Sequence, residues 1–260
     1  MESIAPLVLA CDTSQAACSV ALVQGPPQNT PENIIVHAAM CQPAQKSPTQ
    51  KQKGHAEALI PMVQKIMAVA GQDFAALDGL AVTIGPGTFT GVRVGLSAMR
   101  GLAVGLGKPL IGVGTLQAMA QAVIPQVNSD TAILVAVDAR RDTYYCQLFD
   151  PAKTPLCVPQ ALSGQAVLHL LATQKSLGDR VALVGTGKEN LMRLAKDMNK
   201  KLYPSMAADF PLAENVARLA LAQPIKTWPD ILPAPLYLRP PDAALPNPAQ
   251  QLRRTQKAPS

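Results

Sequence analysis

The chain contains 260 residues, of which 48% are apolar and only 3% aromatic, so small aliphatic side chains must fill its core. Its formal charge of +6 lies in two Pro- and Gln-rich segments, residues 40–54 and 224–260, each of which carries +3. The remaining body has no net charge, which argues against a clustered basic face that grips nucleic acid directly.

The first half of the chain predicts three strands, a helix, a strand after a loop, and a second helix after a glycine-rich turn. A lysine-rich loop, residues 40–54, precedes the first helix. In chain order, we expect the strands and helices at residues 7–11, 19–23, 33–40, 55–70, 79–84 and 90–106.

The second half repeats this order, and a loop at residues 204–211 joins its last two helices. We expect three strands, a helix, a strand and two helices at residues 132–137, 143–149, 155–159, 163–172, 181–184, 189–199 and 213–222. Two tandem βββαβα units of this kind predict a duplicated, ribonuclease-H-like α/β fold with mixed sheets.

The repeat suggests a division into three parts. Each unit's first strand ends in an aspartate, Asp12 or Asp138, an arrangement that resembles the actin, Hsp70 and sugar-kinase superfamily. We expect an N-terminal half at residues 1–109 that carries a partner interface, and a C-terminal half at residues 110–224. Residues 225–260 are expected to form a basic, Pro-rich and partly disordered tail.

The cellular context is predicted from weaker signals. Five cysteines without a CxxC pair favour reduced thiols. The apolar run before Cys11 has no preceding Lys or Arg, so it is not interpreted as a signal sequence. The uncharged residues 109–129 contain a proline and several glutamines and predict a strand and a helix rather than a membrane span. We therefore expect a cytoplasmic protein without membrane contact.

The most informative motif is the turn Gly85-Pro86-Gly87-Thr88 with the helix start that follows it. Pro86 between two glycines predicts a tight turn, and Thr88 or Thr90 can cap the next helix. Further short motifs lie at residues 12–14, 54–57, 138–140 and 237–239. Together, over about residues 7–240, these runs resemble the TsaB (YeaZ) family. The lysine-rich loop and the tail after residue 239 depart from that family's shorter form.

This resemblance implies a role in making threonylcarbamoyladenosine at tRNA position 37. It implies a non-catalytic dimerisation subunit that pairs with a TsaD-like paralogue, which holds a metal and transfers the threonylcarbamoyl group. A TsaE-like P-loop ATPase would join the pair, and tRNA would be engaged indirectly.

Metal chemistry is not predicted for this chain. The catalytic paralogue carries two histidines four residues apart on a helix, a spacing that suits a metal. The matching positions here are Thr115 and Met119, and His37 and His169 stand alone in the sequence. No Cys or Ser lies beside a His in a recognisable nucleophile motif either. We therefore expect no catalytic residues and no metal.

Nucleotide chemistry is expected to be vestigial, because kinases of this superfamily place glycines beside each aspartate so that backbone N–H groups reach phosphate. Here no glycine follows Asp12, and bulky side chains stand after Asp138. Only the loop around Gly185 resembles an adenosine loop, and it fits a plain strand-to-helix turn equally well. We expect no cofactor of the chain's own, with ATP or ADP shared at a complex interface. The candidate vestigial nucleotide site comprises Asp12, Thr13, Ser14, Asp138, Gly185 and Gly187.

The two N-terminal helices are the predicted partner surface. Glycines inside the helix at residues 90–106 each cost about 1 kcal/mol of helix stability relative to alanine. Small residues recur every fourth position, at 91 and 95 and at 97, 101 and 105, and such rows allow another backbone to approach closely. The helix at residues 55–70 is apolar on more than one side, which favours a buried core helix or an interface. The resemblance favours the interface, with a homodimer using the same face. The predicted interface residues are Leu59, Met62, Val63, Ile66, Gly95, Ala98, Gly101, Leu102 and Gly105.

The sequence therefore predicts a scaffold subunit of a tRNA-modifying complex. Two alternatives remain: an ATP-dependent small-molecule kinase that acts alone, or a metallopeptidase-like protein. The missing phosphate-loop glycines argue against the first alternative, and Thr115 and Met119 argue against the second.

Overall fold

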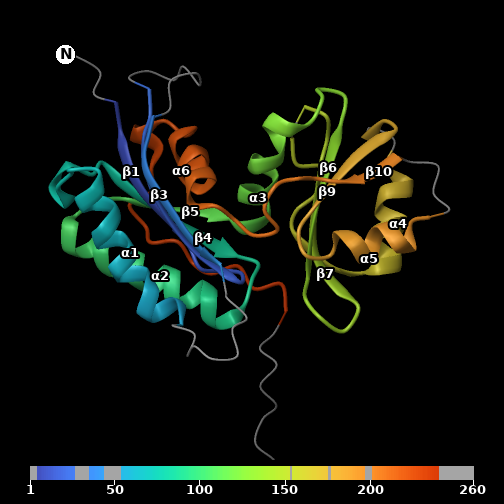
Figure 1. The fold of residues 1–260 in the computed structure, drawn as a ribbon, viewed down its shortest axis with the longest axis horizontal. Helices are drawn as coiled ribbons and strands as arrows, with labels where there is room; N and C mark the ends of the chain where they lie inside the picture. The colour runs from blue at the N-terminus through green and yellow to red at the C-terminus, as the bar shows by residue number, and fades with distance from the viewer. Residues whose placement is uncertain are drawn as a thin grey trace, which may run out of the picture.

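The computed structural model describes residues 5–26, 35–43, 54–152, 154–174, 177–196 and 201–239, and it contains two five-stranded mixed sheets (Figure 1). In each sheet, the first three strands in chain order form antiparallel pairs. The fourth strand pairs parallel with the first, and the fifth pairs parallel with the fourth. This repetition confirms the expected duplicated α/β fold.

The first sheet has the strand order β3-β2-β1-β4-β5. Alternate residues of β1 face opposite ways: Leu9 lies in the core under α1 and α2, whereas Val8 and Ala10 lie in the core under α6. The elements of this half are β1 (Leu7–Asp12), β2 (Ala17–Gln24), β3 (Ile35–Pro43), α1 (His55–Val69), β4 (Gly79–Gly85), α2 (Phe89–Leu106) and β5 (Leu110–Gly114).

The second sheet has the matching order β10-β9-β6-β7-β8. Its outer face packs against α4 and α5 through a core that includes Val167 and Leu191. Its elements are β6 (Ala132–Asp138), β7 (Thr143–Phe149), β8 (Gln160–Ser163), α4 (Gly164–Thr173), β9 (Arg180–Val184), α5 (Lys188–Leu194) and β10 (Lys201–Pro204). Short 3-10 helices lie at Phe74–Ala76, Ile124–Gln126 and Ile225–Thr227.

Two helices lie between the sheets and join the halves (Figure 1). Helix α3 (Thr115–Val123) follows the first sheet but buries Leu116 and Met119 against the second. Helix α6 (Ala213–Leu221) follows the second sheet but buries Val216 and Ala220 against the first. This exchange gives each half a helix from the other half's chain segment.

The division of the halves therefore differs from the expected boundary at residue 109. Strand β5 pairs parallel with β4 and completes the first sheet, although the sequence assigned it to the second half. Helix α6 also belongs to the core of the first half. The sequence pattern could not show the place of α6, because its apolar face does not indicate which sheet covers it.

Some predicted elements were wrong in detail. The strand expected at residues 155–159 lies instead at Gln160–Ser163, and Pro155 makes only a single bridge to Phe149. Two prolines in the expected run remove ladder donors, which explains the displacement. Strand β10 was not predicted, because it is a short edge strand within a loop-like sequence. Helix α5 ends at Leu194 rather than at residue 199.

Several expectations fall outside the described residues. The lysine-rich loop is described only at its two ends, and the tail is described only as far as residue 239. Among the described residues, no helix combines the length and the apolarity that crossing a membrane requires.

Candidate functional site

Three of the sequence motifs, the turn at residues 85–88 and the runs at 138–140 and 237–239, contribute residues to a cleft between the two halves. The cleft has a volume of about 500 Å³. It is bounded on one side by Gln15 and the turn that precedes α2, and on the other by the end of β6. The residues that line it are Gln15, Pro86, Gly87, Thr88, Phe89, Val137, Asp138, Ala139, Arg140, Tyr145, Leu236, Tyr237, Leu238 and Arg239.

Asp12 lies behind this cleft and is fully buried at the end of β1. Its Oδ1 accepts hydrogen bonds from the Ser14 amide (3.2 Å), the Ser14 hydroxyl (2.6 Å) and the Thr83 hydroxyl (2.5 Å). Among the described residues, its Oδ2 has no hydrogen-bond partner. Burial raises the pKa of Asp12 to about 6, against the lowering effect of these hydrogen bonds and of His55. This carboxyl group therefore faces the interior and not the cleft.

The residues after Asp12 are covered by α2. A Cβ atom on Gly91 would lie 2.1 Å from the Thr13 carbonyl oxygen, and one on Gly87 would lie 2.4 Å from that of Ser14. The Thr13 hydroxyl donates to the Gly91 carbonyl at 2.7 Å, and the His55 ring Nδ1 lies 3.1 Å from the Thr13 carbonyl oxygen. The glycines of the motif therefore serve a close approach between two backbones. Thr13 and Ser14 do not line the cleft.

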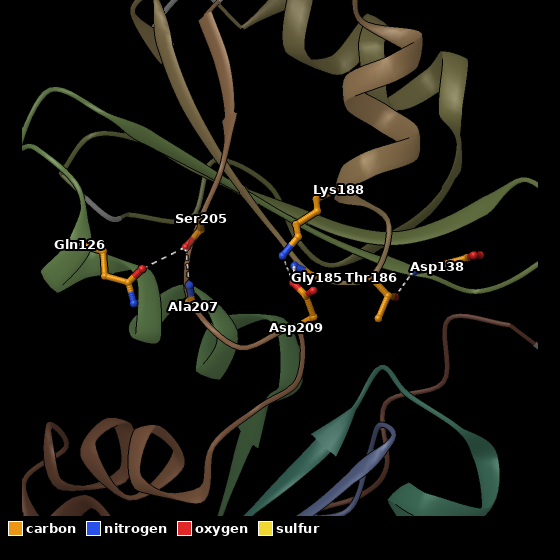
Figure 2. A network of polar contacts seen from close by, with 8 residues as sticks. All are labelled: Gln126, Asp138, Gly185, Thr186, Lys188, Ser205, Ala207 and Asp209. Atoms are coloured by element: carbon orange, nitrogen blue, oxygen red, sulfur yellow. Dashed lines mark hydrogen bonds and ion pairs between the residues drawn. The ribbon is translucent and has the colours of Figure 1, made fainter. Parts of the chain in front are cut away.

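In the second half, Asp138 is exposed at the cleft. Its Oδ1 accepts a hydrogen bond from the Arg140 amide at 2.7 Å. The Asp138 amide donates to the Thr186 hydroxyl at 2.9 Å (Figure 2). The structure thus brings the Gly185–Gly187 loop to Asp138 but keeps Asp12 apart from them in the first half.

An internal carboxylate occupies the donors of the Gly185 loop. Asp209, from the segment between β10 and α6, accepts from the Gly185 amide at 3.1 Å and from Lys188 Nζ at 2.8 Å (Figure 2). Gly185 has a φ of +105°, and a Cβ on it would lie 2.4 Å from the Ala136 carbonyl oxygen. A ligand phosphate would have to displace Asp209 to reach this amide, and it would compete with Asp209 for the ammonium group. Asp209 was not among the predicted site residues, because no local sequence pattern links it to the loop.

The hairpin after Asp138 has an unusual backbone. Arg140, Arg141 and Asp142 have φ values of +65°, +53° and +50°, a region that side chains other than glycine rarely adopt. Arg239 supports this hairpin from the C-terminal segment: Nη1 donates to the Ala139 carbonyl at 3.0 Å and Nη2 donates to the Thr143 hydroxyl at 2.7 Å.

The segment before Arg239 lies against β4 and β5 of the first sheet. The Leu236 amide donates to the Ile84 carbonyl at 2.7 Å, and a Cβ on Gly85 would lie 2.5 Å from the Leu236 carbonyl oxygen. Pro233 packs closely against Gly112 of β5. The C-terminal motif therefore forms a strap, residues 233–239, that contacts both halves across the cleft.

Most of the predicted interface residues are core residues. Four apolar side chains of α1 pack against the first sheet and α2, and each is at most 8% exposed. A Cβ on Gly95 would lie 2.6 Å from the Thr13 hydroxyl, so this glycine also faces inward. The broad apolar face of α1 is thus mainly a core face. The predicted residues that lie in this core are Leu59, Met62, Val63, Ile66 and Gly95, of which Leu59 also lines the groove between α1 and α2.

The other predicted residues lie at the surface of α2. Gly101 and Gly105 are exposed, and added Cβ atoms on them would meet nothing within 4 Å, whereas Ala98 and Leu102 are half-buried. Beside them, α1 and α2 enclose a groove of about 470 Å³. Its lining residues are Ala56, Leu59, Ile60, Phe89, Thr90, Arg93, Val94, Ser97 and Ala98.

A metal site is not evident in the described part of the chain, where no three or more His, Cys, Asp or Glu side chains gather at metal-binding distance. Thr115 and Met119 are fully buried, and the Thr115 hydroxyl donates to that of Ser14 at 3.3 Å.

This chain is similar in sequence to proteins of tRNA threonylcarbamoyladenosine synthesis. The family model for TsaD, tRNA N6-adenosine threonylcarbamoyltransferase, matches residues 44–217, more than half of the chain. The TsaB protein of Escherichia coli K12, named for tRNA threonylcarbamoyladenosine biosynthesis, is 38% identical over 138 residues, covering 53% of this chain and 52% of that protein. The chain thus spans about half the length of this curated relative.

Two further relatives are matched over more of their length. The TsaB protein of Buchnera aphidicola is 27% identical over 203 residues, covering 76% of this chain and 89% of that protein. The solved structure of YeaZ from Pseudomonas aeruginosa matches with a TM-score of 0.63 and 26% identity, covering 90% of this chain and 100% of that one. The chain therefore belongs to the TsaB/YeaZ family.

Proposed function

We propose that this chain is a non-catalytic subunit that docks on a TsaD-type partner and supports threonylcarbamoyl transfer to N6 of adenosine 37 in tRNA. The observation that carries the proposal is the groove between α1 and α2, whose lining is apolar apart from Thr90, Arg93 and Ser97. The names of the relatives, which refer to tRNA threonylcarbamoyladenosine biosynthesis, supply the reaction.

The groove has the chemistry of a protein contact. Ile60 is 41% exposed and Phe89 is 38% exposed at its walls. Covering such side chains with a partner's apolar surface contributes about 25 cal/mol per Å² removed from water. The exposed glycines 101 and 105 continue the surface along α2 and allow a partner helix to approach closely. A partner helix pair on this face would complete a four-helix contact.

The absence of an active site of the chain's own is part of the proposal. Asp12 is buried away from the cleft, and the donors at Gly185 and Lys188 already bind Asp209. These contacts argue against an ATP-dependent kinase that acts alone, and buried Thr115 and Met119 argue against a metallopeptidase. In the proposed complex, ATP or ADP is shared at the interface, a TsaE-type ATPase joins, and tRNA is held chiefly by the partner.

The test is co-expression with the TsaD-type subunit of the same organism, followed by sizing and an assay of tRNA modification. Ile60→Glu places a charge in the groove, where an unpaired buried charge costs several kcal/mol, so pairing and modification should be lost. Val69→Glu is the matched control: Val69 lies on the same helix, is 69% exposed and does not line the groove. Normal pairing of Ile60→Glu, with native circular dichroism, would place the contact elsewhere.

A further inference from the structure

An aromatic and cationic cluster includes two of the residues that line the groove between α1 and α2, Phe89 and Arg93. The guanidinium carbon of Arg93 lies 3.7 Å from the centre of the Phe89 ring and 5.9 Å from that of the Tyr237 ring. The two rings lie 5.3 Å apart. Arg93 and Phe89 come from α2, and Tyr237 comes from the strap, so two distant segments together hold one arginine side chain.

The contacts of Arg93 leave part of its guanidinium group without a partner. Nε donates to the Tyr237 hydroxyl at 2.9 Å. Within the described part of the chain, no acidic side chain pairs with Arg93, and its Nη atoms have no hydrogen-bond acceptor. Stacking on Phe89 and the bond through Nε restrict the orientation of the plane. The remaining Nη donors therefore form a preorganised fork of the kind that binds a carboxylate with two parallel hydrogen bonds.

Arg93 is also the only charged residue among the nine that line the groove. We propose that Arg93 binds an aspartate or glutamate side chain of the protein partner that docks in this groove, and so fixes the partner's register. The inference rests on the proposed function, because it takes the groove as the contact. It adds a specificity-determining residue and the chemistry of the group that it recognises.

A carboxylate on a protein fits this site better than a nucleic-acid phosphate. Nucleic acid needs several clustered cations, because each contact neutralises one phosphate. The groove supplies one arginine beside apolar walls, which suits one acid on an otherwise apolar helix.

The test measures binding of the TsaD-type subunit to wild type, Arg93→Gln and Arg93→Lys at low and high salt, by calorimetry. Arg93→Gln should weaken the Kd about tenfold or more and flatten its salt dependence. Arg93→Lys keeps the positive charge but lacks the paired Nη donors, so its Kd should lie between those of wild type and Arg93→Gln. Lys65→Gln is the control, since Lys65 is exposed on α1 and does not line the groove, and its Kd should stay within about twofold. Matching melting curves establish that each variant is folded.

The outcomes separate this inference from the function on which it rests. Normal binding by Arg93→Gln, with binding lost in Ile60→Glu, overturns the carboxylate contact alone. Normal binding by both variants overturns the groove as the docking site. If Arg93→Gln instead dissolves a homodimer of the chain and leaves the Kd for the partner unchanged, the acid belongs to a second copy, and the proposal for the TsaD-type partner fails.

Discussion

The Thr13 carbonyl oxygen lies 2.1 Å from the position that a Cβ atom on Gly91 would occupy, and the Thr13 hydroxyl donates to the Gly91 carbonyl at 2.7 Å. The loop after β1 and the first turn of α2 are thus in backbone contact, with no room for a side chain between them. Farther along the same helix, an added Cβ on Gly101 would meet nothing within 4 Å.

This contrast predicts opposite effects of the same substitution. Gly91→Ala should destabilise the protein by about 1–3 kcal/mol, because the clash with backbone outweighs the gain in helix propensity. Gly101→Ala should stabilise it by up to about 1 kcal/mol through helix propensity alone. Urea unfolding of both variants measures the free energies of unfolding. Equal effects of the two substitutions would contradict the close contact at Gly91.

The contacts of Asp209 predict that its loss destabilises the protein more than the loss of Glu214 does. Asp209 and Glu214 each form a 2.8 Å ion pair, and their side chains are 34% and 33% exposed. Asp209 also accepts a hydrogen bond from the Gly185 amide. Asp209→Ala should cost about 1–2 kcal/mol, because a backbone donor and Lys188 both lose their acceptor. Glu214→Ala should cost about 0.5 kcal/mol or less, as expected for a surface pair on a helix. Thermal unfolding distinguishes the two variants. If Asp209→Ala loses no more stability than Glu214→Ala, the proposed role of Asp209 in holding the Gly185 loop is contradicted.

The sequence predicted the fold well where a strong pattern was present. The buried strands β1, β4 and β6 are continuous apolar runs, and the turn before α2 has the glycines and the Thr88 cap that the motif indicated. The prediction was weaker for β8 and β10, which are four-residue edge strands without a buried face. Short edge strands depend on the neighbour to which they bond, and local sequence does not reveal that neighbour.

The candidate sites were predicted less well for a related reason. Gly91 and Gly101 belong to similar rows of small residues, yet only Gly91 faces another segment of the chain. Ile60, which lines the groove, was not among the predicted interface residues, whereas Ile66, which was predicted, is buried in the core. Hydrophobic periodicity shows that a helix has an apolar face but not which neighbour covers it.

The two hydrogen bonds of Arg239 predict that a guanidinium group is needed where the strap meets the second half. Arg239→Lys should cost about 1–2 kcal/mol, because an ammonium group cannot reproduce both the bond to the Ala139 carbonyl and the bond to the Thr143 hydroxyl. Arg193→Lys is the control, since within the described residues the exposed Arg193 guanidinium bonds only Asn190, and its replacement should cost about 0.5 kcal/mol or less.

Hydrogen exchange locates the effect of Arg239→Lys. The Thr143 amide bonds the Arg140 carbonyl within the hairpin that Arg239 supports, so exchange of residues 139–143 should become faster in this variant. Loss of stability without faster exchange there would mean that Arg239 acts somewhere other than this hairpin.

Asp12 predicts a pH dependence of stability. Burial raises its pKa to about 6 in the folded protein, from 3.8 for an unperturbed carboxyl group. Between these values the folded state holds a proton that the unfolded state has released. The protonated form therefore contributes stability that is complete below pH 4 and is lost as the pH rises through about 6. Relative to Asp12→Asn, wild type should lose on the order of 2 to 3 kcal/mol between pH 4 and 7.

The comparison with Asp12→Asn isolates this carboxyl group, because the other titrating groups are common to both proteins. Urea unfolding at several pH values gives the difference in free energy of unfolding, and a constant difference would show that Asp12 ionises normally. Thr83→Val tests the cause. This variant removes the 2.5 Å hydrogen bond that lowers the pKa of Asp12, while the burial that raises it remains. Its transition should therefore move to higher pH than that of wild type, and a shift to lower pH would mean that the Thr83 bond favours the protonated form.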